Sequence, residues 1–337
     1  MRCTNNRKRV FKRKRQRKRR RFPLGFVIPA AVVIALSIII LWPFSKYVFQ
    51  YEAEFYNQNV DAISLPVDTF CVTNEDVTDL DFQLSGDVHA AALFDISAGE
   101  VVYAKDVHER LYPASTTKLL TAYVALKYGK LDDIVTVSKQ AVGVPWDSSR
   151  AGLQVGDELT LETLLYALML PSGNDSAVAI AEYISGSEKE FAELLNREAS
   201  LLGATNTHFV NAHGYHDEKH YTTAYDLHLI MKACTTQEEL MRVLSTDRYD
   251  AQITQANGTY RNVTWHQTNQ YVIGSQSAPD DVTVIGGKTG TTDQAGSCLV
   301  LYSVSSDNEK FVSIVMGADD KSRLYKDMTG LLMMEEK

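Results

Sequence analysis

Residues 113–126 read Pro-Ala-Ser-Thr-Thr-Lys-Leu-Leu-Thr-Ala-Tyr-Val-Ala-Leu. The proline at the start of this run and Gly129 just past its end predict a helix. On such a helix Ser115 and Lys118 share one face, so the lysine amine can reach the serine hydroxyl. A serine hydroxyl is a poor nucleophile until a base removes its proton. A lysine can be that base when burial or a nearby cation disfavours its ammonium form. Taken alone, the pattern is more typical of a helix cap beside a solvated lysine.

Two further short motifs follow along the chain. Ser172-Gly-Asn174 begins 57 residues after Ser115, at a break between two expected helices, and Lys288-Thr-Gly290 begins 116 residues after Ser172. Ser172 can relay a proton, and Asn174 can hold a substrate amide. If Lys288 lies on an edge strand, that strand can pair with an extended substrate while Lys288 and Thr289 face its terminal carboxylate. Taken singly, these motifs are also typical of a helix cap and of a lysine that guards a sheet edge.

The expected secondary structure places strands at both ends of this region. Two short apolar runs predict a hairpin with Gly99 at its turn, and three β-rich segments follow near the end of the chain: 90–94, 101–104, 282–285, 297–304 and 310–317. Helical patterns lie between them and after them, at 161–170, 175–183, 191–202, 224–232 and 322–334. We therefore expect a mixed α/β (α+β) fold, with an antiparallel sheet built from both ends of the domain and flanked by helices.

Charge divides the chain into two unequal parts. The 337 residues carry a net charge of −8, yet residues 1–21 hold 13 of the 34 Lys and Arg residues and no acidic residue. The rest of the chain has 34 − 13 = 21 basic and 42 acidic residues, a charge of −21. A nucleic-acid patch is one interpretation of the basic run. Because an uncharged apolar segment begins directly after it, we expect a topology signal instead, and no nucleic-acid partner.

The apolar segment, residues 22–45, is long enough to cross a bilayer. The basic run before it places the N-terminus in the cytoplasm. We predict a cytoplasmic tail at 1–21, a single transmembrane helix at 22–45, an extracytoplasmic stalk at 46–79 and a catalytic domain at 80–337, held at the cell membrane. A cleaved signal peptide is the alternative. It is disfavoured because the apolar run exceeds the usual length and no small-x-small cleavage site follows it closely.

The three motifs, in this order on a helix, a loop and a strand, form the signature of serine β-lactamases and penicillin-binding proteins. Longer segments carry the likeness further: Tyr-Pro-Ala-Ser-Thr-Thr-Lys, Leu-Pro-Ser-Gly-Asn-Asp-Ser-Ala, Gly-Ala-Thr-Asn-Thr-His-Phe-Val-Asn-Ala-His-Gly and Lys-Thr-Gly-Thr-Thr-Asp-Gln-Ala-Gly-Ser-Cys-Leu-Val. From about residue 87 to its end, the chain resembles the low-molecular-mass penicillin-binding proteins, which are serine-type D-alanyl-D-alanine carboxypeptidases.

The resemblance implies a β-lactamase/transpeptidase-like fold with an all-helical subdomain. It also implies an enzyme that removes the terminal D-alanine of peptidoglycan stem peptides and needs no metal or cofactor. The implied catalytic residues are Ser115, which forms the acyl-enzyme and is also the target of β-lactam antibiotics, Lys118 as its base, and Ser172. The implied substrate-binding residues are Asn174, Lys288, Thr289, Gly290, Thr291 and Arg323. The backbone N–H groups of Ser115 and Thr291 would form the oxyanion hole, and Arg323 would hold the substrate's terminal carboxylate.

Other functions compete with this interpretation. A D,D-endopeptidase would use the same residues on cross-linked peptides. A class A β-lactamase would carry a deacylating Glu beyond the second motif, where residues 205–213 hold no acid. A zinc peptidase could use His213, His216 and His220, but no HExxH is present. A non-catalytic binding module on the same fold is the last alternative.

The four cysteines show neither a CxxC motif nor a regular spacing. This pattern argues against a disulfide framework and against a zinc knuckle. We expect isolated thiols, with Cys298 buried on a strand. One pairing among Cys71, Cys234 and Cys298 stays open.

Overall fold

The computed structural model describes residues 71–78 and 82–336. The predicted cytoplasmic tail (1–21), the predicted transmembrane helix (22–45) and most of the predicted stalk lie outside these residues. Within the described part of the chain, no helix combines the length and the apolar character needed to cross a membrane.

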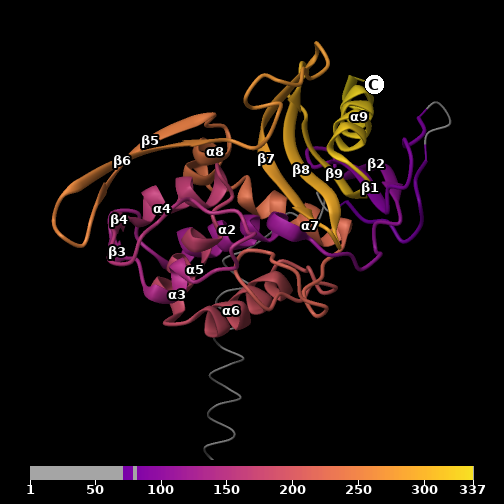
Figure 1. The fold of residues 1–337 in the computed structure, drawn as a ribbon. Coiled ribbons are helices and arrows are strands. Elements are labelled where there is room, and N and C mark those ends of the chain that lie inside the picture. Colours follow the sequence, from indigo (N-terminus) through magenta and orange to yellow (C-terminus); the bar gives the residue numbers. More distant parts are fainter. Residues whose placement is uncertain (1–70, 79–81, 337) are drawn as a thin grey trace, which may run out of the picture. The chain divides into compact units, whose positions relative to one another are not determined.

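The central element of the domain is a five-stranded sheet in the order β2-β1-β9-β8-β7. Neighbouring strands run antiparallel, and the register pairs Ala91 of β1 with Val315 of β9. The strands are β1 (Ala90–Asp95), β2 (Glu100–Lys105), β7 (Val282–Thr292), β8 (Gly296–Ser305) and β9 (Lys310–Ala318). The sheet therefore joins segments from both ends of the domain, which confirms the predicted α/β class (Figure 1). In this order β7, which carries the third motif, is an edge strand, as predicted.

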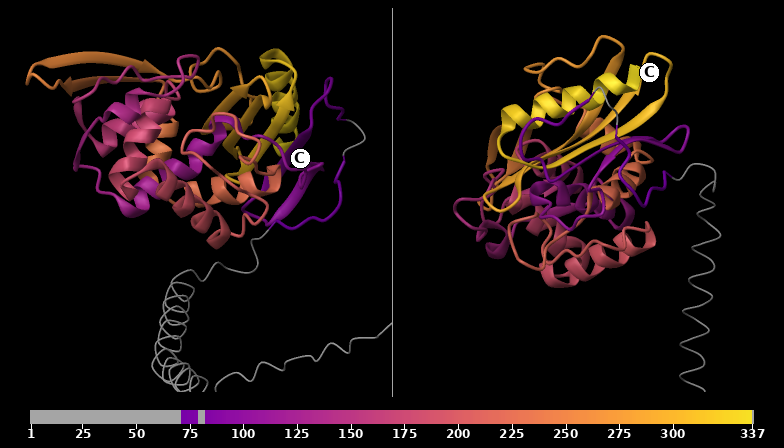
Figure 2. Two further views of the ribbon diagram at one scale, coloured as in Figure 1. Left: turned by 60° about the horizontal axis from the view of Figure 1, so that its bottom comes forward. Right: turned by 90° about the vertical axis from the view of Figure 1, so that its right-hand side faces the viewer.

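Helices cover both faces of the sheet. One face packs on a group of helices, and the other on α9 (Lys321–Leu332), which lies across the sheet in the right-hand view of Figure 2. Alternate residues of β1 serve the two cores: Phe94 packs toward the helical group and Leu93 toward α9. The helical group contains α2 (Lys118–Tyr128), α3 (Lys139–Val142), α4 (Leu161–Met169), α5 (Asn174–Ser185), α6 (Glu188–Leu201), α7 (Ala224–Cys234) and α8 (Glu238–Leu244).

Helix α2 lies at the centre of the helical group. Its residues are apolar on nearly every side, and Leu119, Leu120 and Val124 are completely buried. A helix without a polar face is buried all round, because no side of it can meet water. The first turn of this helix is consequently held rigidly, and it carries the first motif.

A second, smaller sheet corrects the implied all-helical subdomain, because its strands lie in sequence among the helices of that group. Its order is β3-β4-β5-β6, formed by β3 (Ile134–Thr136), β4 (Glu158–Thr160), β5 (Arg248–Thr254) and β6 (Tyr260–His266). The long hairpin β5–β6 extends away from the helices in Figure 1. The first two strands are only three residues long, which is too short for an alternating pattern to be recognised.

Residues 71–78 correct the predicted start of the domain at residue 80. Val77 exchanges two backbone hydrogen bonds with Ala104 of β2, of 2.8 and 2.7 Å. Cys71 is completely buried, and its carbonyl oxygen accepts a hydrogen bond of 2.9 Å from the Tyr225 hydroxyl. The last residues assigned to the stalk are thus part of the folded domain. Their polar, acidic sequence concealed this, because the two residues that pack with the core, Cys71 and Val77, form no alternating or helical pattern.

The described cysteines are isolated thiols, as expected. Cys71, Cys234 and Cys298 are free and buried, and Cys298 lies on β8. Burial raises the pKa of each thiol, to about 11 for Cys71 and Cys298. Because the thiolate is the reactive form, these residues are chemically inert packing groups.

Candidate active site

The first motif forms a tight turn at the start of α2. Residues Ala114–Thr117 form a 3-10 helix, named η2, that runs directly into α2 at Lys118. The turn begins with Ala114 at a φ of +47°, a conformation that residues other than glycine rarely adopt. Such local strain persists only where the surroundings impose it, and it is common at active sites. Here it precedes Ser115 directly.

Lys118 is completely buried and makes three close polar contacts. Its Nζ lies 2.9 Å from Oγ of Ser115, 2.8 Å from Oδ1 of Asn174 and 2.7 Å from the carbonyl oxygen of His213. A neutral amine has two hydrogens and one lone pair. It can donate to the amide and the carbonyl oxygens, which cannot donate in return, while its lone pair accepts the Ser115 hydroxyl proton. The contacts therefore suit a lysine that acts as the base for Ser115.

The electrostatic surroundings favour this neutral form. Burial lowers the pKa of Lys118 well below its usual value, and the charge of Lys288 lowers it further, while Asp175 partly opposes them. Lys288 is itself completely buried on β7, and burial lowers its pKa to about 7. Lys288 can thus exchange protons near neutral pH, and Lys118 loses its proton far more easily than an exposed lysine does.

The second motif lies at the start of α5. Asn174 is the first residue of this helix, and its backbone N–H donates to the carbonyl oxygen of Ser149 at 2.9 Å. Ser172 has a φ of +62°, and its buried Oγ has no hydrogen-bond partner among the described residues. A buried hydroxyl without a partner is rare in folded proteins. It lines the cleft beside Ser115, so it is available to a bound substrate.

The third motif brings the edge of β7 against the first. A side chain at Gly290 would place its Cβ 2.9 Å from the backbone nitrogen of Ser115 and 2.9 Å from the carbonyl oxygen of Pro113. Only glycine allows this approach. The hydroxyl of Thr289 lies 2.7 Å from that of Thr268, which follows β6. Thr291 lines the same cleft.

A loop that sequence analysis considered as a zinc candidate and as part of the family resemblance supports the nucleophile. The ring Nδ1 of His220 accepts from the backbone N–H of Val210 at 3.1 Å, so its Nε2 carries the proton and donates to the Thr117 hydroxyl at 2.8 Å. Burial lowers the pKa of His220 to about 3. In the described part of the chain, no cluster of His, Cys, Asp and Glu has the arrangement of a metal site.

His213 in the same loop is held from two sides. Its Nδ1 accepts from the backbone N–H of Tyr215 at 3.0 Å, and its Nε2 lies 3.2 Å from the carboxylate of Glu188. Burial lowers the pKa of His213, with Glu188 opposing the shift, so the neutral imidazole donates a hydrogen bond to Glu188 rather than forming an ion pair. The carbonyl oxygen of this residue is the one that contacts Lys118.

The three motifs line one cleft of about 140 Å³. Ser149, Thr268 and Gln270 contribute further walls, and α9 contributes Lys321, Leu324 and Tyr325. Among the described residues that line the cleft, none is Asp or Glu, and Lys321 is the exposed cation. The cleft is therefore suited to a substrate with a negative charge.

The structure does not bring Arg323 into this cleft. Its guanidinium pairs with Asp319 and lies 3.7 Å from the carboxylate of Asp320, on the side of α9 that packs against Gly86. Lys321, two residues earlier on the same helix, lines the cleft instead. A helix turns by about 200° over two residues, so the two side chains leave different faces.

Several residues of the site carried no sequence signal. Ser149, Thr268 and Gln270 lie in loops whose sequences are ordinary for turns. Glu188 is one of many acidic residues on a helix that is otherwise typical of a surface element. Lys321 lines the cleft with the third motif because of the rotation of α9 about its own axis. The sequence does not reveal that rotation, so it could not indicate Lys321.

The fold and the site define a serine peptidase of the penicillin-recognising class, and the comparisons with known proteins agree. The family model described as D-alanyl-D-alanine carboxypeptidase, Peptidase_S11, matches residues 81–320. The chain belongs to this family, which confirms the resemblance inferred from the motifs.

Individual relatives support the assignment. The chain is 33% identical over 258 residues to D-alanyl-D-alanine carboxypeptidase DacF of Bacillus subtilis, covering 74% of this chain and 62% of that protein. It is 35% identical to DacA of Haemophilus influenzae, covering 67% of this chain and 56% of that protein. The chain thus spans about three fifths of the length of these relatives. The crystal structure of the Streptomyces K15 DD-transpeptidase matches with a TM-score of 0.70 and 30% identity, over 77% of this chain and 99% of that one.

Proposed function

We propose that this protein is a serine-type D-alanyl-D-alanine carboxypeptidase that removes the terminal D-alanine from peptidoglycan stem peptides. The observation that carries the proposal is the position of Lys118. It is a completely buried lysine whose amine lies 2.9 Å from the Ser115 hydroxyl, and its other two contacts are to oxygens that only accept. This is the arrangement that makes a serine nucleophilic without a histidine.

In the proposed acylation step, Ser115 Oγ attacks the carbonyl carbon between the two D-alanines while its proton passes to Lys118. The negative oxygen that develops accepts hydrogen bonds from the backbone N–H groups of Ser115 and Thr291. The C–N bond then breaks, and the proton held by Lys118 passes through Ser172 and Lys288 to the leaving amine, so that Lys118 is neutral again. The products are free D-alanine and an ester on Ser115.

In the proposed deacylation step, a water molecule attacks the ester carbonyl, and Lys118 accepts its proton. The bond to Ser115 Oγ breaks, the hydroxyl regains its proton, and the shortened peptide leaves with a new carboxylate. A β-lactam would form the same kind of ester. Because no Asp or Glu lines the cleft in the described part of the chain, hydrolysis of that ester has no carboxylate base, and we expect the adduct to persist. This feature favours a carboxypeptidase over a β-lactamase.

The proposed substrate lies along the open edge of β7. The backbone of this strand pairs with the extended peptide, and Asn174 contacts a substrate amide. The terminal carboxylate meets the Thr289 hydroxyl and the ammonium of Lys321, the exposed cation of the cleft. Lys321 is exposed and charged, and no acid lines the cleft among the described residues, so the cleft has a positive potential that attracts such a carboxylate.

Covalent labelling with a fluorescent penicillin tests the proposal. The parent protein should form a stable adduct and release D-alanine from a peptide that ends in D-Ala-D-Ala. Ser115→Ala should do neither while keeping its melting temperature. Lys118→Arg should also lose acylation, because a guanidinium is effectively never deprotonated. Labelling that persists in Ser115→Ala would refute the assignment of the nucleophile.

We also propose that the domain is held outside the cytoplasm by an uncleaved transmembrane helix at residues 22–45. The support is the basic run that precedes this uncharged segment. A protease added to spheroplasts should remove the domain and spare an epitope fused to residue 1. A shortened, soluble form in the medium would show cleavage instead.

A further inference from the structure

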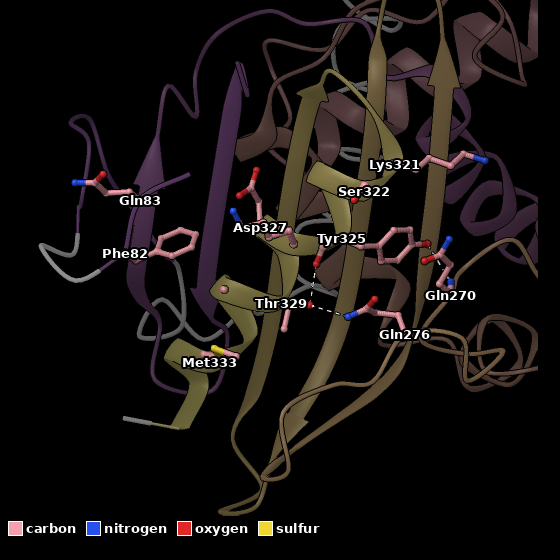
Figure 3. A pocket seen from close by; sticks show the side chains of 12 residues that line it. Phe82, Gln83, Gln270, Gln276, Lys321, Ser322, Tyr325, Asp327, Thr329 and Met333 are labelled. Carbon is pink, nitrogen blue, oxygen red and sulfur yellow. Dashed lines mark hydrogen bonds between the residues drawn. The ribbon is translucent and has the colours of Figure 1, made fainter. Parts of the chain in front are cut away.

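The catalytic cleft has a direction, which follows from the course of β7. In the proposed function the terminal carboxylate of the substrate meets Thr289 and Lys321, and the scissile carbonyl oxygen meets the backbone N–H of Thr291. Figure 3 shows Lys321 extending from the start of α9 to the side of that helix on which Gln270, another residue of the cleft, lies. An extended peptide and a strand both rise about 3.4 Å per residue. The residue before the two D-alanines is therefore expected beside Asp293, two positions beyond Thr291.

A second wall of the cleft is held in place by the second motif and the residue that follows it. The loop of residues 144–153 contributes Ser149 to the cleft, and the carbonyl oxygen of Ser149 accepts a hydrogen bond of 2.9 Å from the backbone N–H of Asn174. The buried carboxylate of Asp175 accepts hydrogen bonds of 2.8, 3.0 and 3.0 Å from the backbone N–H groups of residues 151–153. This loop also carries Asp147, so the position of that side chain at the cleft is fixed by several contacts.

Three side chains from separate loops lie together at this end of the cleft. The Tyr215 hydroxyl donates to the carboxylate of Asp147, and both oxygens of that carboxylate lie 3.2 Å from it. This hydrogen bond raises the pKa of the Tyr215 phenol, and the charges of Asp147 and Asp293 raise it further, so both carboxylates are near the phenol. Tyr215 follows Gly214, which packs directly on the η2 turn of the nucleophile. We call Asp147, Tyr215 and Asp293 the acyl-side rim.

The acyl-side rim carries negative charge that is not paired within the domain. Among the described residues, no Lys, Arg or His lies within ion-pair distance of Asp147 or Asp293, and both are exposed. The other end of the cleft carries the exposed ammonium of Lys321. Independently of these charges, Ser172 is 5% exposed and its Oγ has no partner among the described residues, so a polar ligand is needed to complete the cleft.

We propose that the acyl-side rim binds the side-chain ammonium of the residue that precedes the two D-alanines, so that the enzyme prefers stem peptides whose third residue is a diamino acid with a free amine. The inference rests on the proposed function and deepens it, because it names the substrate class of the same site. A primary ammonium has three donors, and the carboxylates of Asp147 and Asp293 accept them. Opposite charges at the two ends of the cleft then fix the direction of the peptide. A peptide whose amine is already acylated loses the contact.

Two tripeptides test the proposal on the full-length protein in detergent. Both consist of an Nα-acetylated L-lysine followed by D-Ala-D-Ala, and they differ only in the ε-amine, which is free in one and acetylated in the other. The readout is the ratio of kcat/KM for the free amine to kcat/KM for the acetylated amine, measured from the release of D-alanine. The ratio of the parent should be about five, the scale of exposed ion pairs. It should fall toward one in about 1 M NaCl, which screens exposed charges.

Variants of the acyl-side rim locate the preference. Asp147→Asn and Asp293→Asn keep the shape of the side chain and should each lower the ratio by about half, and the double variant should bring it to about one. The matched control is Asp307→Asn, an exposed aspartate in the turn at the other end of β8, and it should keep the ratio of the parent. Each ratio compares two substrates on the same protein, so a loss of folded enzyme in a variant cancels.

A parent that hydrolyses both tripeptides equally at low salt would overturn this inference and leave the proposed function intact. A double variant that keeps the full preference of the parent would overturn it as well, because another group would then bind the ammonium. Failure of the proposed function is distinguishable, because neither tripeptide would be hydrolysed and Ser115 would take no penicillin label.

Discussion

Lys118 and Lys288 approach one cleft from different elements, α2 and β7, and both are completely buried. Among the residues that the structure describes, no carboxylate lies within ion-pair distance of either ammonium. Burial raises the free energy of the charged state of both lysines, and the charge of Lys288 raises that of Lys118 further. The fold thereby provides two amines that lose protons easily, at the site where a serine must be deprotonated.

The first prediction concerns the pH dependence of acylation. Acylation needs neutral Lys118, so its rate rises with pH through the pKa of that lysine. The charge of Lys288 lowers this pKa. In Lys288→Met the pKa of Lys118 should therefore rise. The acidic limb of the pH profile of penicillin acylation should then move to higher pH. This shift is expected even if the substitution also lowers the maximal rate. The exposed substitution Lys189→Met is the control. A limb that stays in place, or moves to lower pH, would show that Lys288 does not tune the base.

The same variant yields a prediction for stability. Burial lowers the pKa of Lys288 from 10.5 to about 7, so the folded state binds fewer protons than the unfolded state between these values. Stability is therefore lost as the pH falls from about 10 through 7, by an upper bound of about 5 kcal/mol at 1.36 kcal/mol per unit. Lys288→Met removes this loss. Urea unfolding should show a stability advantage of the variant that is larger at pH 7 than at pH 10, and a constant difference would contradict the prediction.

Alanine substitutions at two glycines can distinguish the effect of backbone strain from that of steric crowding near the nucleophile. Gly214 and Gly186 have φ values of +83° and +81°, so alanine at either position incurs a similar backbone cost of about 1 kcal/mol. A Cβ at Gly214 would lie 1.7 Å from the carbonyl oxygen of Ala114, whereas one at Gly186 has no atom within 4 Å. Gly214→Ala should therefore lower the melting temperature much more than Gly186→Ala and abolish acylation. Equal effects on both measurements would argue against close packing of the loop on the η2 turn.

Much of this architecture could be predicted because the chemistry is local or ordered along the chain. Ser115 and Lys118 are three residues apart, so a helix suffices to join them, and the pairing of both chain ends in one sheet follows from where the β-rich segments occur. The edge position of β7 followed from the requirement that Lys288-Thr-Gly290 pair with a substrate.

The remainder depends on tertiary contacts that leave no periodic signal. Glu188 reaches the site because α6 packs beside the loop of His213, and neither segment indicates the other. Arg323 and Lys321 are both ordinary helix residues, and only the rotation of α9 decides which of them lines the cleft. Residues 71–78 join the domain through the backbone hydrogen bonds of Val77 and the burial of Cys71, and neither feature forms a periodic pattern.

Glu188 is predicted to be a positioning residue for the base. Its carboxylate accepts hydrogen bonds of 3.2 Å from the His213 ring and from the backbone N–H of Ala212. This holds the carbonyl oxygen of His213 against Lys118. Glu188→Ala should lower the rate constant of penicillin acylation about tenfold, the effect of losing roughly 1.4 kcal/mol of positioning. Glu188→Gln keeps both acceptor contacts and should restore most of the rate. Equal losses in the two variants would show that the charge, not the position, matters.

The last prediction concerns which cation holds the terminal carboxylate of the substrate. The family resemblance implies Arg323, whereas the structure places Lys321 in the cleft and pairs Arg323 with Asp319. A guanidinium that already has a carboxylate partner is a poor ligand for another, while the Lys321 ammonium has no partner among the described residues. Lys321→Ala should therefore lower kcat/KM for a peptide ending in D-Ala-D-Ala by about 1.5–3 kcal/mol, the usual worth of a hydrogen bond to a charged group.

Arg323→Ala is the matched control on the same helix, and its kcat/KM should stay within about twofold of the parent's. A second substrate with a C-terminal carboxamide separates recognition from folding. Without the carboxylate, the parent loses the contact as well, so Lys321→Ala and the parent should hydrolyse the amide at similar rates. If Arg323→Ala instead lowers activity toward the free acid and spares the amide, the guanidinium must leave Asp319 when substrate binds, and the arginine is the clamp. A loss that is equal for both substrates in Lys321→Ala would mean that this lysine supports the fold of the cleft and not the recognition of charge.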